Sequence, residues 1–276
     1  LPTVTVNSGA ICAGQSFTMV PSGASTYTYS NGSSVATPTA NATYSVSGTD
    51  ANGCVSNVDA VSFLTVNPLP LVSVSSGAIC AGESYSISAT GALTYTSVPA
   101  LASEVVTPTT TTSYTITGTD NNGCVSTNLA VSTVTVNSLP TISVNSGAIC
   151  AGQSFTMVPS GAATYTYSNG TDIVTPSADA TYSVNGTDAN GCVSNVEAVS
   201  SITVNALPTV LAVTNNTLLC TGETATLTVS GAASYTWSTT DNTTNIAVSP
   251  TVQTTYTVDG TDANGCTNSA TITQDV

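Results

Sequence analysis

The sequence contains no lysine, arginine or histidine, so every charged side chain is acidic. The 14 Asp and Glu residues give a formal net charge of −14. A chain without cationic side chains cannot neutralise phosphate groups, which supply most of the non-specific affinity of proteins for nucleic acids. It also lacks the basic clusters that bind anionic lipid. We therefore exclude a nucleic-acid partner and electrostatic docking on membranes.

The same absence removes most enzyme chemistry. Histidine and lysine are the usual general base near neutral pH, the Schiff-base amine and the commonest metal ligand. Serine and threonine form no catalytic triad without a basic partner. The acidic residues outside one repeated turn motif are scattered singly, so no pair of carboxylates for glycoside hydrolysis is evident. We predict a protein that is not an enzyme and binds no cofactor.

Long apolar runs are also missing, which argues against membrane insertion. The chain begins Leu1-Pro2-Thr3 and carries no signal peptide, so we expect a processed product or a segment of a longer protein. Hydrophobic residues make up 41% of the chain and charged residues only 5%. This composition predicts a folded protein with a neutral surface rich in hydroxyl groups.

Eight cysteines are present, and they form two series that each recur about every 70 residues. The first series is Cys12, Cys80, Cys150 and Cys220, and the second series is Cys54, Cys124, Cys192 and Cys266. One cysteine of each series falls in each quarter of the chain, which indicates four tandem repeats. Leu-Pro pairs mark the boundaries, so the predicted domains are residues 1–68, 69–138, 139–206 and 207–276.

Apolar and polar residues alternate within each repeat, as in Tyr27-Thr28-Tyr29, and Gly, Pro and Asn-Gly interrupt the alternation every eight to twelve residues. This pattern predicts short, half-buried strands in an antiparallel β-sandwich. In the first repeat we expect strands near residues 3–7, 15–20, 25–30, 34–38, 42–49 and 54–66. The predicted architecture is all-β, with four tandem sandwiches in a rod.

The repeated motif Ile-Cys-x-Gly-x-Ser, followed by an aromatic strand and then Gly-Thr-Asp-x-Asn-Gly-Cys, resembles immunoglobulin-like, PKD-like repeats of large Bacteroidota cell-surface proteins. Those proteins include gliding-motility-type adhesins and type IX secretion substrates. Here the motif stands as Ile11-Cys12-Ala13-Gly14 and Gly48-Thr49-Asp50-Ala51-Asn52-Gly53-Cys54, and it recurs in all four repeats. The resemblance implies immunoglobulin-like sandwiches and an extracellular or cell-surface location, but a shared fold does not fix function.

The cysteines are predicted to form disulfides. Structural zinc needs closely spaced ligand pairs, whereas Cys12 and Cys54 lie 42 residues apart and no histidine is present. An even number of cysteines without any Cys-x-x-Cys motif also suits an oxidising compartment. A domain of about 70 residues is near the size at which a core alone is marginal, so a covalent link is expected.

Two pairings of these cysteines stay open. The family resemblance implies pairing within a repeat, such as Cys12 with Cys54. Sandwich geometry instead places Cys12 and Cys54 at opposite poles, separated by a strand of about 23 Å, while a disulfide needs Cα atoms about 4.4–6.8 Å apart. The alternative is pairing between consecutive repeats: Cys12–Cys124, Cys80–Cys192 and Cys150–Cys266. Cys54 and Cys220 would then bond to neighbours beyond the four repeats.

The motif Thr-Asp-x-Asn-Gly offers weak calcium candidates, namely Asp50, Asp120, Asp188 and Asp262. Carboxylate and amide oxygens suit calcium, but one carboxylate per motif is too few for a calcium cage. The stronger interpretation is a hairpin in which Asn-Gly supplies the positive φ angles and the aspartate bonds the local backbone.

Tyrosines recur at two positions of each repeat. Tyr44, Tyr114, Tyr182 and Tyr256 begin the penultimate strand, where immunoglobulin-like sandwiches carry a tyrosine corner. Tyr27, Tyr95, Tyr165 and Tyr235 lie in the preceding aromatic strand, together with Tyr29, Tyr167 and Trp237. Aromatic rows can bind sugar rings, but one aromatic at each alternate position is more typical of a core.

The sequence therefore predicts a non-enzymatic structural segment of an extracellular filament, stalk or giant adhesin, stabilised by disulfides. A neutral β-surface without edge lysines also predicts self-association. The alternative function is a carbohydrate- or surface-binding module with possible glycan contact through the aromatic strands.

Overall fold

The structure, a computed structural model, describes all residues from Leu1 to Val276 and consists of β-strands joined by turns, without any helix. It divides into two compact units, Leu1–Ser138 and Leu139–Val276, each holding two β-sandwiches in tandem. The alternation of apolar and polar residues thus correctly predicts the all-β fold class. The finer domain boundaries within each unit stay a prediction. No segment forms an apolar helix long enough to cross a lipid bilayer.

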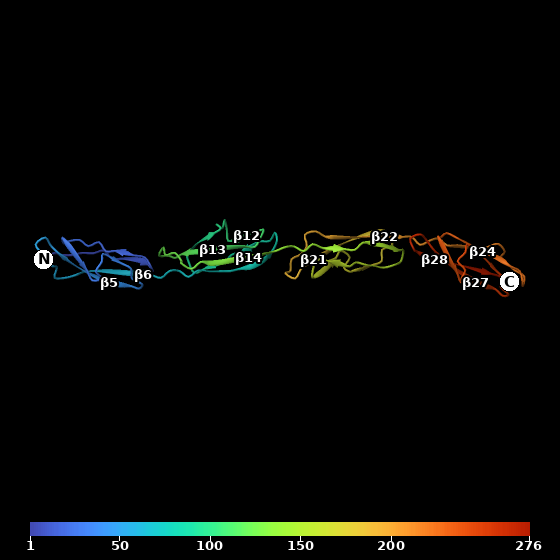
Figure 1. The fold of residues 1–276 in the computed structure, drawn as a ribbon, viewed down its shortest axis with the longest axis horizontal. Helices are drawn as coiled ribbons and strands as arrows, with labels where there is room; N and C mark the ends of the chain where they lie inside the picture. Colours follow the sequence, from blue (N-terminus) through green and yellow to red (C-terminus); the bar gives the residue numbers. More distant parts are fainter. The chain divides into compact units, whose positions relative to one another are not determined.

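The first sandwich contains six strands: β1 (Gly9–Cys12), β2 (Phe17–Thr18), β3 (Thr26–Tyr29), β4 (Val35–Ala36), β5 (Ala42–Thr49) and β6 (Ala60–Asn67). Its main sheet has the order β1-β6-β5-β3, and β2 pairs with β4 in a second, smaller sheet. Buried side chains from both sheets meet between them, including Met19 and Ala36 on one side and Val46 and Leu64 on the other. Figure 1 shows β5 and β6 side by side in the blue part of the chain.

The second and third sandwiches repeat this plan with two added short strands each. The second contains β7 (Ser73–Val74), β8 (Gly77–Cys80), β9 (Tyr85–Ser86), β10 (Ala89–Thr90), β11 (Thr94–Val98), β12 (Val105–Val106), β13 (Thr112–Thr119) and β14 (Ala130–Asn137). The third contains β15 (Ser143–Val144), β16 (Gly147–Cys150), β17 (Phe155–Thr156), β18 (Pro159–Ser160), β19 (Thr164–Tyr167), β20 (Ile173–Val174), β21 (Ala180–Thr187) and β22 (Ala198–Asn205). Their main sheets have the orders β11-β13-β14-β8 and β16-β22-β21-β19.

The fourth sandwich has two three-stranded sheets. Its strands are β23 (Leu211–Thr214), β24 (Ala225–Ser230), β25 (Ser234–Trp237), β26 (Asn245–Val248), β27 (Thr254–Thr261) and β28 (Thr267–Gln274). The sheets have the orders β23-β24-β26 and β25-β27-β28. Its core is the largest of the four clusters and is the only one built around a tryptophan, Trp237. The sheet β23-β24-β26 contributes buried side chains such as Leu227 to the core that contains Trp237.

Two expectations for the first sandwich are wrong. Residues 3–7 form only an isolated bridge at Thr5, and the true first strand is Gly9–Cys12, which runs parallel to the last strand rather than antiparallel. Gly9 is needed in this strand because a Cβ atom there would lie 2.6 Å from the Phe17 ring. The last strand also begins at Ala60, later than the expected residue 54, because Cys54 to Asp59 form the connection after the turn.

Candidate functional site

The second-series cysteines follow a tight turn that an aspartate holds in shape. In the first sandwich the Asp50 Oδ1 atom accepts hydrogen bonds from the backbone N–H groups of Asn52 and Cys54, both at 2.9 Å. The Asp50 N–H donates to the Cys54 carbonyl at 3.0 Å, which closes the turn. Only Gly53 has a positive φ, 81°, so the expectation that Asn-Gly supplies two such angles is wrong. The aspartate fixes the backbone of the cysteine that follows.

The same turn recurs in the other sandwiches with nearly unchanged geometry. Asp120, Asp188 and Asp262 each accept two backbone N–H groups at 2.8 Å, one of them from the following second-series cysteine. One carboxylate oxygen is thus occupied by the turn itself. The structure also contains no group of three or more Cys, Asp or Glu side chains that would hold a metal ion. The backbone bonds at Asp50, Asp120, Asp188 and Asp262 are those that the turn interpretation predicts.

The first-series cysteines end a strand and begin another turn. Cys12 ends β1, where it lies beside Asn67 at the end of the last strand. The Gln15 N–H donates to the Cys12 carbonyl at 3.0 Å, and the Gln15 side chain accepts from the Cys12 N–H at 3.3 Å. Gly14 between them has a φ of 85°, which favours glycine there. Cys12 is therefore placed at the pole of the sandwich where its last strand ends.

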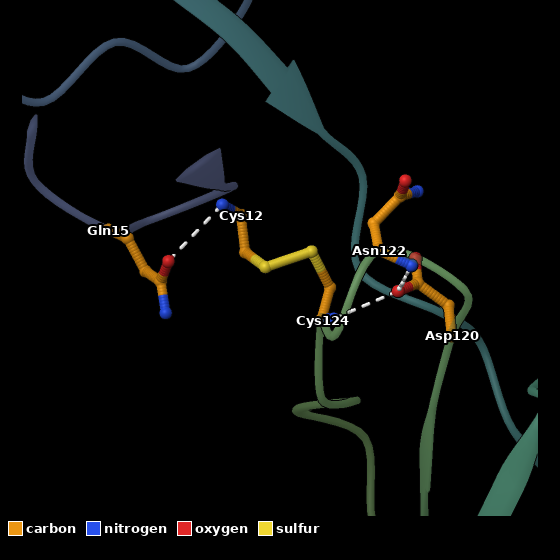
Figure 2. Close-up of a disulfide and its surroundings, with 5 residues drawn as sticks. All are labelled: Cys12, Gln15, Asp120, Asn122 and Cys124. Atoms are coloured by element: carbon orange, nitrogen blue, oxygen red, sulfur yellow. Dashed lines mark hydrogen bonds between the residues drawn. A yellow bond between two sulfur atoms is a disulfide. The ribbon is translucent and has the colours of Figure 1, made fainter. Parts of the chain in front are cut away.

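The two cysteine series meet between consecutive sandwiches. Cys12 bonds Cys124 with a Cα–Cα distance of 5.5 Å, and Cys150 bonds Cys266 at the same distance. Figure 2 shows Cys12, on a strand end of the first sandwich, joined to Cys124, on the turn that Asp120 holds. The structure therefore has the pairing between repeats at these four positions, and it does not pair Cys12 with Cys54. We call these two connections the disulfide joints.

Strand length explains why pairing within a sandwich is absent. The turn at Asp50 follows β5, and β6 then runs the length of the sandwich to Asn67, beside Cys12. Eight residues of β6 span about 26 Å, whereas a disulfide needs Cα atoms about 4.4–6.8 Å apart. Cys12 and Cys54 are thus too far apart to bond. Cys124 lies at the pole of the second sandwich that adjoins Cys12.

The remaining cysteines divide into two kinds. Cys54 and Cys220 are free thiols and both are exposed. Cys80 and Cys192 are disulfide-bonded. Among the second series, Cys124, Cys192 and Cys266 are 0% exposed, so the exposed Cys54 differs from its equivalents although its turn has the same hydrogen bonds.

Replacing Asp120 with alanine should lower the free energy of unfolding of the first compact unit by about 1–2 kcal/mol, because two backbone N–H groups lose their acceptor. Urea unfolding measures the loss. The control is Asp120→Asn, whose amide oxygen still accepts both bonds and which should lose less than half as much. Equal losses for the two variants would show that the oxygen acceptor does not hold the turn.

The first tyrosine of the aromatic strand bonds the local backbone in all four sandwiches. The hydroxyl groups of Tyr27, Tyr95, Tyr165 and Tyr235 each donate to the carbonyl of an alanine three residues earlier, at 2.8–2.9 Å. The backbone-bonding tyrosine is thus in this strand, and not at Tyr44, Tyr114, Tyr182 and Tyr256, where the resemblance to immunoglobulin-like domains places a tyrosine corner. Trp237 is 2% exposed, and its Nε1–H donates to the Thr243 carbonyl at 3.0 Å. Trp237 therefore offers no face to a sugar.

The second sandwich has an open cleft that the sequence did not reveal. Ser97 occupies the position of Tyr29, Tyr167 and Trp237, so the aromatic ring of the other sandwiches is missing there. The resulting cleft has a volume of about 720 Å³, and its lining includes Ile87, Tyr95, Ser97 and Ile116. Leu101 covers part of it, with its N–H bonded to the Ser97 hydroxyl at 3.0 Å. Aligning the four repeats at this one position would have found it.

Among the titratable groups, Tyr167 has a pKa that departs from its ordinary value. Burial raises the pKa of the Tyr167 hydroxyl above its ordinary value, and the negative charge of Asp172 and the nearby Tyr165 act in the same direction. A phenol with a raised pKa stays protonated at neutral pH and is not a general base. The repeated residues build a turn, a strand end and the disulfide between them.

Comparisons with known proteins give only low similarity to solved structures. No protein-family profile matches the chain, and no curated protein sequence matches it. Among solved structures, a Ca²⁺-stabilized adhesin with which an Antarctic bacterium binds ice is 16% identical, with a TM-score of 0.38 over 99% of this chain and 98% of that one. Titin domains I67–I69 are 10% identical, with a TM-score of 0.36 over 75% and 98% of the two chains. Sidekick-1 immunoglobulin domains 1–5 are 12% identical, with a TM-score of 0.30 over 98% and 80%. These values are too low to bring a partner, ligand or activity to this chain.

Proposed function

We propose that the chain is a non-enzymatic structural segment of an extracellular filament, stalk or giant surface adhesin, in which sandwiches follow one another in series. The observation that carries the proposal is the pair of disulfide joints, Cys12–Cys124 and Cys150–Cys266. A disulfide inside a domain stabilises that domain, whereas a disulfide between domains ties successive domains together. This arrangement suits a protein that transmits tension along its length.

The disulfides support the extracellular location, because such bonds persist outside the reducing cytosol. We extend the proposal to the pairing of Cys80 with Cys192 that the sequence suggests, which would link the second repeat to the third. With that bond, each sandwich would be tied to the next by the same strand end and the same turn. A Bacteroidota source and secretion by the type IX route belong to this proposal through the sequence resemblance alone.

Imaging and light scattering of the native material test this function. The proposal predicts a polymer in which sandwiches are arranged in series. Monodisperse single chains in native material would contradict the filament, while a linked peptide containing Cys12 and Cys54 would contradict the joints.

The absence of cationic side chains predicts how the melting temperature responds to salt and to a reductant. No side chain can form a salt bridge, and the 14 carboxylates only repel one another. At about 1 M NaCl the Debye length falls to about 3 Å, so repulsion is screened and the melting temperature should stay constant or rise. A thiol reductant should lower it by several degrees, since it opens the disulfide joints. Melting that is lowered by salt and unchanged by reductant would contradict this account.

A second candidate is glycan binding, and the cleft at Ser97 is the observation that favours it. The cleft combines an aromatic face from Tyr95 with the carboxylate of Glu104 and the hydroxyl of Ser103, groups of the kinds that contact sugars. A glycan array probed with the native chain and with a Ser97→Tyr variant, which fills the cleft, tests this candidate. Binding that the variant loses would support it, and an array without signal would reject it.

A further inference from the structure

We propose that Cys220 of one copy of the chain forms a disulfide with Cys54 of a second copy, so that chains join end to end. The inference rests on the proposed series arrangement and extends it from sandwiches within a chain to sandwiches in different chains. Cys54 and Cys220 are the two free thiols, and both are exposed. They belong to opposite series, as do the partners in each disulfide joint.

Cys54 is held in the geometry of a bonded cysteine. Its N–H donates to Asp50 Oδ1 at 2.9 Å, and the N–H of Cys124 donates to Asp120 Oδ1 at 2.8 Å. The glycines before them, Gly53 and Gly123, have φ angles of 81° and 79°. The turn that presents Cys124 to Cys12 is therefore already formed around Cys54, although Cys54 has no partner in this chain.

Cys220 is likewise held as its bonded equivalents are. The Cys220 N–H donates to Glu223 Oε2 at 2.9 Å, and the Cys80 N–H donates to Glu83 Oε2 at the same distance. The turn closes in both cases through an N–H bond to the cysteine carbonyl at 3.0 Å. Since Cys80 is disulfide-bonded, this turn is compatible with a disulfide at its first cysteine.

The exposure of Cys54 shows what its turn lacks. Cys124 and Cys266 sit in the same kind of turn and are 0% exposed, and each is bonded to the preceding sandwich of its compact unit. Cys54, in contrast, is exposed and forms no disulfide within residues 1–276. The poles at Cys54 and Cys220 are thus the two halves of a joint that the structure shows assembled twice. A sandwich from a second copy is the occupant with matching chemistry.

The symmetry of this contact decides the product. Cys220 and Cys54 lie on different surfaces of the chain, so the contact between copies is head to tail rather than two-fold symmetric. Head-to-tail contacts that do not close into a ring extend into open polymers. Each chain carries one of each surface, and each added chain presents a new free thiol. We therefore expect linear chains of copies rather than a single dimer.

The bond forms by exchange with a low-molecular-weight disulfide, which is the oxidant. The Cys54 thiolate attacks one sulfur of that disulfide, forms a mixed disulfide and releases one small thiol. The Cys220 thiolate of a second copy then attacks the Cys54 sulfur and releases the second small thiol. Two protein thiols lose two protons and two electrons, and the small disulfide gains both as two thiols.

Two single variants test the pairing. Cys54→Ser leaves only the Cys220 thiol, and Cys220→Ser leaves only the Cys54 thiol; both sites are exposed, so both variants should keep the native melting temperature. Native chain, each variant alone and an equimolar mixture are incubated with oxidised and reduced glutathione. Non-reducing electrophoresis then sizes the products. Cleavage before aspartate releases residues 50–58, which contain Cys54, and residues 188–240, which contain Cys192 and Cys220. Fragmentation of the linked peptide in the mass spectrometer then assigns the bond to Cys220 or to Cys192.

The native chain should give a ladder of disulfide-linked oligomers, each variant alone should stay mainly monomeric, and the mixture should stop at a dimer that links the two peptides. Absence of a ladder with two reactive thiols per chain would overturn the proposal. So would dimers of either variant alone in yields equal to the mixture. If the Cys12–Cys124 peptide persists in those samples, the failure concerns only the contact between copies, and the proposed function stands.

Discussion

Removing the first disulfide joint with the double variant Cys12→Ala/Cys124→Ala should lower the free energy of unfolding of Leu1–Ser138 by about 4–5 kcal/mol. The bond spans 112 residues, and a cross-link over a loop of that length lowers the conformational entropy of the unfolded chain and so raises its free energy by about this much at 25 °C. Cys12 is 8% exposed and Cys124 is 0% exposed, and alanine fits both buried positions because it is smaller than cysteine and has no polar side-chain atom. Calorimetry and urea unfolding measure the loss.

The matched control removes a cysteine without removing a bond. Cys220→Ala alters an exposed free thiol, and its unfolding should match that of the native chain within about 0.5 kcal/mol. The joint should also couple the two sandwiches of the unit, so the double variant should unfold over a broader range or in two steps. A double variant as stable as the control would contradict the structural role of the joint.

Replacing Trp237 with alanine should destabilise the fourth sandwich by about 3–5 kcal/mol, the usual range for deleting a buried tryptophan. Trp237 is 2% exposed and packs in the core with Leu227 and Val258. Its Nε1–H also bonds the Thr243 carbonyl, which loses its donor in the variant. Urea unfolding followed by circular dichroism measures the effect.

Thr236→Ala is the control for Trp237, since Thr236 is the exposed neighbour in the same strand. It should change stability by less than about 0.5 kcal/mol. Trp237→Phe should fall between the two, because it keeps an aromatic ring but loses volume and the hydrogen bond. A native-like melting temperature for Trp237→Ala, together with loss of binding to a surface or glycan, would show that the ring works as a ligand contact instead.

Local patterns predicted the fold class well. The alternation in segments such as Ala42–Thr49 reports which side chains face the core, and it does so without knowledge of other strands. The strand Gly9–Cys12 escaped prediction because its partner, the last strand, lies more than 50 residues away, and because its glycine is set by contact with Phe17. Long-range pairing of this kind leaves no local periodicity to detect.

The cysteine pairing shows the same limit more sharply. Spacing revealed two series and four repeats, yet Cys12 is nearer in sequence to Cys54 than to Cys124, so sequence distance alone favours the wrong partner. The choice depends on which pole each cysteine occupies, and that follows from the parallel placement of Cys12 beside Asn67. The cleft beside Ser97 was visible in principle, because the aromatic missing from one repeat is present in the other three.

Disulfide mapping of the unreduced native chain tests the central claim, that bonds run between consecutive sandwiches, most directly. The chain has no lysine or arginine for trypsin, but cleavage before aspartate separates residues 1–49, which contain Cys12, from residues 50–58, which contain Cys54. The account predicts that residues 1–49 stay linked to residues 120–171, which contain Cys124 and Cys150, that fragmentation of the linked peptide assigns the bond to Cys124, and that Cys54 is not linked to Cys12. A linked peptide of residues 1–49 and 50–58 would contradict it.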